Sequence, residues 1–133
     1  MLKHDPQIRR PIAILALAAL MTATLPAIGS SGIALADPLT ILSDAQSDFV
    51  YGDYPDCREK LEPLVENNEL DGAHLVDAYV LLARCYADSG DGYIAQDHFR
   101  SAYCAGDGEP IDTSEFRENV VAEYESAMKN YEC

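Results

Sequence analysis

From residue 39 onward, apolar residues recur along the chain at intervals of three and four positions. Such intervals place side chains on one face of an α-helix, whereas a half-buried strand needs strict alternation of apolar and polar residues. The sequence contains no long alternating stretch. The pattern therefore predicts an all-α domain with helices over residues 39–51, 55–67, 73–88, 93–104 and about 113–131.

Short turns join these helices in pairs. Segments 52–55 and 89–92 are rich in Gly, Asp and Pro, a composition that favours tight turns between helices. A Ser or Thr before an apolar helix is a typical N-cap, and the last helix has such residues at its start. The sequence thus predicts antiparallel hairpins at about 39–67 and 73–105, followed by a capping helix at about 113–131 that Thr113 or Ser114 begins.

The first 36 residues have the parts of a secretory signal peptide. Basic residues precede an almost entirely apolar run over residues 11–28, and alanines at positions 34 and 36 precede Asp37. This order of charge, apolar run and small residues is the signature of a segment that is cleaved after export. We therefore expect cleavage before Asp37 and a periplasmic or secreted protein.

An uncleaved membrane anchor is the alternative for this segment. Pro11 and Pro26 bracket an apolar run of only 14 residues, whereas a helix that crosses a bilayer needs about 20. We therefore expect no stable membrane span after cleavage of the signal peptide.

Acidic residues dominate the charge of the chain. It carries 23 Asp and Glu against nine Lys and Arg, a net charge of -14. The predicted signal peptide holds three of the basic residues and one acidic residue, so the remaining 97 residues carry six and 22, a net of -16. Binding of nucleic acid or of an anionic membrane surface needs a basic face. We expect neither kind of partner.

The two predicted hairpins resemble each other, which indicates a helical repeat. Gly52 and Gly90 each end the first helix of a hairpin and lie 38 residues apart, a period that is typical of helical repeats. The second hairpin resembles a tetratricopeptide repeat. The residues that match are Tyr79, Leu82, Ala83, Tyr86, Gly90, Ala95, Phe99 and Ala102. Its small alanines let two helices approach closely, and its larger side chains fill the space around them.

The first hairpin departs from the tetratricopeptide pattern at two positions. Asp48 stands where an aromatic residue is expected, and Cys57 replaces the small alanine. The resemblance covers about residues 39–105, and it implies a module that binds other proteins and supplies no reaction. The chain also resembles a repeat module of exported bacterial proteins, through its Gly-Asp-Tyr turn, its Leu-Glu-Pro-Leu segment and its Cys-Tyr pair.

Four cysteines follow the predicted signal peptide, and an even number in a small exported domain predicts two disulfides. In an antiparallel stack the start of the second helix lies beside the end of the third, which favours a Cys57–Cys85 bond. Cys104 and Cys133 remain as the second pair, although a long closing helix would carry Cys133 away. A folded-back tail, two free thiols and a cross-link between chains stay open there. A buried, reduced Cys85 is the alternative to the first bond.

The first helices of the two hairpins would line the concave face of such a stack. The residues that helical spacing places on this face are Leu39, Leu42, Gln46, Phe49, Asp77, Val80, Arg84 and Asp88. This mixed apolar and acidic set suits a protein or peptide partner with some basic character. It lacks the Lys and Asn set with which some tetratricopeptide domains bind a C-terminal carboxylate. Coverage by the chain itself or by a second copy is the alternative.

Residues in arrangements typical of catalysis or metal binding are sparse. Asp97 and His98 are an acid–base pair in composition only, because adjacent helix positions point in different directions. Segments 88–92 and 107–112 are rich in oxygen ligands, but neither has the spacing of a calcium-binding loop. The cysteines are too dispersed for zinc, and phosphate-binding motifs are absent. We therefore expect no enzymatic activity, no cofactor and no metal.

These observations predict an exported, non-enzymatic module that mediates protein–protein interaction in the cell envelope. The partner is an unidentified protein or peptide. A self-associating structural domain, present as a homo-oligomer, is the first alternative, and an acidic calcium-binding protein is the second.

Overall fold

The structure is a computed structural model that describes residues 35–133. The predicted signal peptide lies outside these residues except for its last two. The described part is all-helical, without strands, as the sequence predicts. Its five helices are α1 (Pro38–Tyr51), α2 (Tyr54–Glu66), α3 (Gly72–Asp88), α4 (Gly92–Ala105) and α5 (Glu118–Met128).

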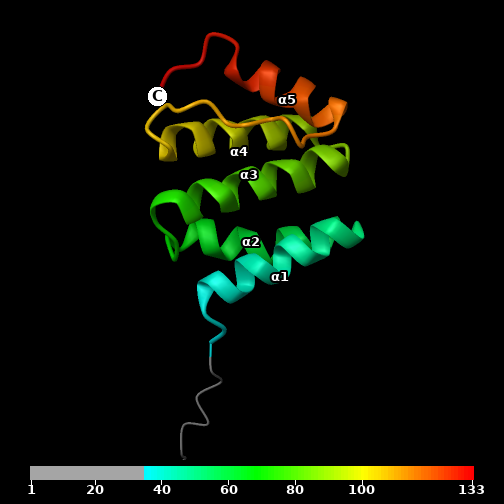
Figure 1. Cartoon of the computed structure of the whole chain (residues 1–133), viewed down its shortest axis with the longest axis vertical. Coiled ribbons are helices and arrows are strands. Elements are labelled where there is room, and N and C mark those ends of the chain that lie inside the picture. The colour runs from blue at the N-terminus through cyan, green and yellow to red at the C-terminus, as the bar shows by residue number, and fades with distance from the viewer. Residues whose placement is uncertain (1–34) are drawn as a thin grey trace, which may run out of the picture. The chain divides into compact units, whose positions relative to one another are not determined.

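The helices stack in chain order from α1 to α5 (Figure 1). The bounds of α1 to α4 agree with the sequence prediction to within one residue at each end. Gly52 and Gly90 both have positive φ values, 83° and 88°, which reverse the chain after α1 and after α3. Glycine adopts this left-handed conformation without the steric cost that a side chain brings. The same turn therefore closes both hairpins.

Residues 38 positions apart occupy equivalent places in the two hairpins. Ala45 of α1 and Ala83 of α3 are both fully buried, and so are Cys57 of α2 and Ala95 of α4. These small side chains lie in the two adjoining hydrophobic clusters that form the core. A small residue at a helix contact lets the two helices approach closely, so the repeated small positions give both hairpins a similar packing.

The last helix is shorter than the sequence predicts. It begins at Glu118 rather than near 113, and it ends at Met128 rather than near 131. Residues 114–116 turn instead, where the Asp112 carboxylate accepts a hydrogen bond from the backbone N–H of Ser114 (2.9 Å) and the Thr113 carbonyl accepts one from Phe116 (3.0 Å). Phe116 then packs on Phe99 of the core, with 6.0 Å between ring centroids. The prediction that Thr113 or Ser114 begins the helix is therefore wrong.

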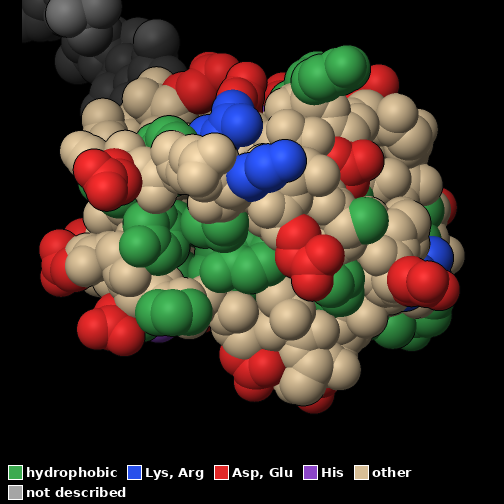
Figure 2. Space-filling view, turned by 90° about the horizontal axis from the view of Figure 1, so that it is seen from above, with side chains coloured by type: hydrophobic (Ala, Val, Ile, Leu, Met, Phe, Trp, Pro, Cys, Tyr) green, Lys and Arg blue, Asp and Glu red, His purple; other side chains and the backbone are tan. Residues whose placement is uncertain are grey.

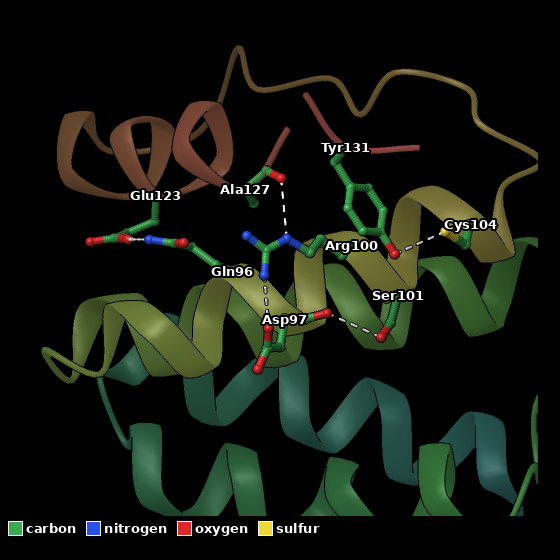
Figure 3. A network of polar contacts seen from close by, with 8 residues as sticks. All are labelled: Gln96, Asp97, Arg100, Ser101, Cys104, Glu123, Ala127 and Tyr131. Atoms are coloured by element: carbon green, nitrogen blue, oxygen red, sulfur yellow. Dashed lines mark hydrogen bonds and ion pairs between the residues drawn. The ribbon is translucent and has the colours of Figure 1, made fainter. Parts of the chain in front are cut away.

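The direction of α5 also differs from that of a simple antiparallel stack. Residues 106–117 run back along α4, so α5 starts beside the start of α4 and runs parallel to it (Figure 1). Three contacts with a constant separation of 27 residues follow this alignment (Figure 3). They join Gln96 to Glu123, Arg100 to the Ala127 carbonyl, and Cys104 to the Tyr131 hydroxyl.

Both expected disulfides are present. Cys57–Cys85 joins α2 to α3, and both residues are fully buried. Cys104–Cys133 joins the end of α4 to the C-terminal tail, where Cys133 is exposed. The parallel course of α5 explains the second bond, because it returns the tail to the end of α4. Among the options that the sequence left open, the folded-back tail is the one observed.

Removal of the buried disulfide should lower stability strongly. Each bond closes a loop of nearly 30 residues, which contributes about 3 kcal/mol by restricting the unfolded chain. We expect replacement of both Cys57 and Cys85 by Ala to lower the melting temperature by roughly 12–24 °C. Circular dichroism measures this change, and alkylation followed by mass measurement verifies the remaining bond. An unchanged melting temperature would contradict the structural role of Cys57–Cys85.

Candidate functional site

A cavity of about 260 Å³ lies between α1 and α3. Its lining residues define what we call the docking groove: Leu42, Gln46, Asp77, Val80, Leu81 and Arg84. Leu42 and Val80 are 38 residues apart, and so are Gln46 and Arg84, so equivalent positions of the two hairpins line one concavity. Five of these six residues belong to the set that helical spacing placed on the concave face. Leu81 is the addition.

Arg84 lies between two aromatic rings at the edge of the docking groove. Its guanidinium carbon is 4.4 Å from the ring centroid of Phe49 in α1 and 4.8 Å from that of Phe116. Cations are attracted to aromatic faces at such distances, and the flat guanidinium stacks well on them. Burial lowers the pKa of Arg84, and the nearby Asp88 and Glu115 oppose this effect. Phe49 therefore contacts Arg84 without lining the cavity itself, and the contact of Phe116 with Arg84 was not predicted from the sequence.

Asp88 does not line the docking groove. Its side chain is only 3% exposed, and it accepts a hydrogen bond from Asn119 of α5 (3.1 Å). The guanidinium of Arg117 lies 3.7 Å from the same carboxylate. Asp88 is therefore covered by residues at the start of α5, and its predicted place on the open concave face is wrong. Leu39, 45% exposed, does not line the cavity either.

Most basic side chains of the described part are already paired with acids. Arg58 binds Asp91, Lys60 binds Asp48 and Arg100 binds Asp97. Arg117 lies near Asp88, as described above. Within residues 35–133, Arg84 and Lys129 are the two cations without a carboxylate at ion-pair distance. Arg84 is the one that lines a cavity.

The Asp97–His98 pair does not form a catalytic dyad. The Asp97 carboxylate accepts a hydrogen bond from Arg100 (3.0 Å), whereas His98 lies between the rings of Tyr79 and Tyr86 at centroid distances of 6.2 and 5.3 Å. Burial lowers the pKa of His98 against the opposing charges of Glu62 and Asp97. The histidine therefore packs as an aromatic ring.

Tyr86 links this aromatic stack to α2. Its hydroxyl donates a hydrogen bond to the Glu62 carboxylate, and Arg58 lies over its ring at 4.9 Å. Burial, followed by the bond to Glu62, raises the pKa of Tyr86 to about 12. This phenol stays protonated at neutral pH, which suits a structural hydrogen bond.

Three acidic side chains of segments 88–92 and 107–112 have partners within the chain. Asp91 pairs with Arg58 (3.3 Å), Asp88 is bound by residues near α5, and Asp112 accepts from Ser114. The backbone hydrogen bond from Ser114 is the main cause that lowers the pKa of Asp112. No group of three or more His, Cys, Asp or Glu residues within 35–133 is placed to hold a metal ion.

The buried position of His98 makes stability depend on pH. Its pKa in the folded chain lies below the value of about 6.5 in the unfolded chain. The unfolded chain therefore binds this proton more readily, so the contribution is complete above about pH 6.5 and declines as the pH falls below it. Between pH 7.5 and 5.5, we expect the melting temperature of His98→Gln to fall by less than that of the parent protein.

His74→Gln is the matched control, because His74 is exposed on α3. Thermal unfolding of the three proteins at both pH values measures the effect. Equal pH dependence in the two variants would show that burial of His98 has no such consequence.

Across residues 35–133, none of the helices has the length and apolar character needed to cross a membrane. Two disulfides are typical of proteins in oxidising compartments outside the cytoplasm. No protein-family model, curated protein or solved structure matches the chain.

Proposed function

We propose that the chain is an exported, non-enzymatic module of the tetratricopeptide-like type, which binds another protein in the cell envelope. The observation that carries the proposal is the docking groove, in which repeated positions of α1 and α3 face one cavity. Hairpin stacks present the first helices of their repeats as a continuous concave surface, and such surfaces bind protein segments. The groove is too small to enclose a typical small-molecule ligand, for which pockets measure about 300–1,000 Å³.

Export is supported by the N-terminal sequence and by the disulfides. The charge and apolar pattern of residues 1–36 is that of a cleaved signal peptide, with Asp37 as the first mature residue. Both disulfides would persist in an oxidising envelope compartment and would be rare in the cytoplasm. Figure 2 shows the α5 end of the stack, where acidic and basic side chains border a central hydrophobic area.

Self-association is the second candidate, because the outer face of α1 is unpartnered. Val50 is 73% exposed and Tyr51 is 82% exposed on this helix, at the end of the stack. A second copy that packs on α1 would cover them. The high negative charge opposes this arrangement, since two like-charged domains repel each other.

Site-specific photo-crosslinking in the exporting cell tests both candidates. We expect a crosslinker at Gln46 or Asp77, in the docking groove, to give one discrete adduct with a different protein. A crosslinker at Glu125, which is exposed on α5, should not give that adduct. A crosslinker at Val50 should stay unreacted if the chain is monomeric.

Two outcomes would contradict the proposal. The first is the absence of an adduct that is specific to the groove positions. The second is an adduct at Val50 with the mass of a covalent dimer, which would favour the self-associating structural domain instead.

A further inference from the structure

The guanidinium of Arg84 is fixed in place but is bound to no anion in the described part of the chain. Rings of Phe49 and Phe116 hold it on two sides, at 4.4 and 4.8 Å. Its Nε is buried and has no hydrogen-bond partner. The same is true of the Oδ2 atom of Asp88, which lies one helical turn away. The two terminal nitrogens have no hydrogen-bond partner either, but they are not buried, and Arg84 lines the cavity.

Apolar side chains lie beside this cation in the docking groove. Leu42, Val80 and Leu81 form an aliphatic wall, and Gln46 adds an amide. A guanidinium whose plane is already fixed loses little conformational freedom when it forms paired hydrogen bonds to a carboxylate. The groove therefore combines a pre-oriented cation with a surface for an aliphatic side chain.

The charges around Arg84 restrict the partner further. Asp77 lines the same cavity, and the charges of Asp88, Glu115 and Arg117 all act on Arg84. Asn119 and Arg117 both contact the Oδ1 atom of Asp88, and no hydrogen bond or ion pair joins Asp88 to Arg84. One carboxylate fits beside Arg84, whereas further negative charge would meet Asp77 and the acidic surface of the domain. The rest of the bound segment should therefore be neutral or basic.

We propose that the docking groove binds an acidic side chain of a partner protein, with the carboxylate on the terminal nitrogens of Arg84 and a neighbouring aliphatic side chain on Leu42 and Val80. This inference rests on the proposed function and names the chemistry of its partner. Arg84 is the only cation among the six groove residues, so it matches a single carboxylate. We assign that carboxylate to a side chain because a cavity of 260 Å³ suits side chains that enter from a backbone outside it.

Titration of the oxidised full-length protein with blocked peptides, followed by NMR, tests the proposal. The probe is acetyl-Leu-Glu-Leu-amide, and the matched control is acetyl-Leu-Gln-Leu-amide, which lacks only the charge. We expect the Glu peptide to shift the amide signals of Leu42, Val80 and Arg84, and to bind roughly tenfold more tightly than the Gln peptide, the difference that one charge-assisted hydrogen bond contributes.

Two variants separate the groove cation from other arginines. Arg84→Gln should lower the affinity for the Glu peptide roughly tenfold. Arg58→Gln should leave its affinity unchanged, because Arg58 also stacks on an aromatic ring but lies on α2, outside the groove. If Arg84→Gln does not fold, the two peptides still test the proposal on the unchanged protein.

Each contrary result has a distinct meaning. Equal binding of the Glu and Gln peptides at the groove would overturn the carboxylate site but leave the proposed function standing. Tighter binding of acetyl-Leu-Leu with a free C-terminus would overturn the assignment to a side chain. If no peptide shifts the amide signals of the groove residues, the inference is also overturned. The crosslinking experiment then tests the proposed function separately.

Discussion

Close approach of helices at fully buried alanines is the constraint on which the rest of the structure depends. Ala45 and Ala83 occupy equivalent positions of α1 and α3, and Ala95 lies in the same cluster as Ala83. Larger side chains at these positions would separate the helices, which normally pack 8–10 Å apart. Because the small positions recur in both hairpins, α1 and α3 lie on one side of the stack. The docking groove between them follows from that repetition.

The closing segment builds part of the docking groove as well as covering the end of the stack. The linker before α5 supplies Phe116, one of the two rings that hold Arg84. The start of α5 covers Asp88, which otherwise would face the same side as Arg84. The Cys104–Cys133 bond then ties the tail to the end of α4. Loss of the closing segment would therefore alter the charge and shape of the groove, and it would expose the hydrophobic cluster that contains Ala83, Ala95 and Phe99.

The sequence predicted the parts of the fold that local periodicity and short turns determine. It gave the four hairpin helices, the burial of Ala83 and Ala95, and the Cys57–Cys85 bond. It also gave five of the six groove residues, because their positions follow from helical spacing. It could not give the course of residues 106–117, which depends on tertiary contacts rather than on periodicity. The contact of Phe116 with Arg84 and the burial of Asp88 depend on that course, so both were missed.

Substitution of a buried alanine tests this account most directly. Ala83→Leu should lower the free energy of unfolding by about 1–3 kcal/mol, because the added atoms have no space in a close-packed contact. Ala122→Leu is the control, since Ala122 is exposed on α5, and its stability should match that of the parent. Chemical denaturation of both variants measures the difference. Equal stability of Ala83→Leu and the parent protein would contradict the close approach of the helices at Ala83.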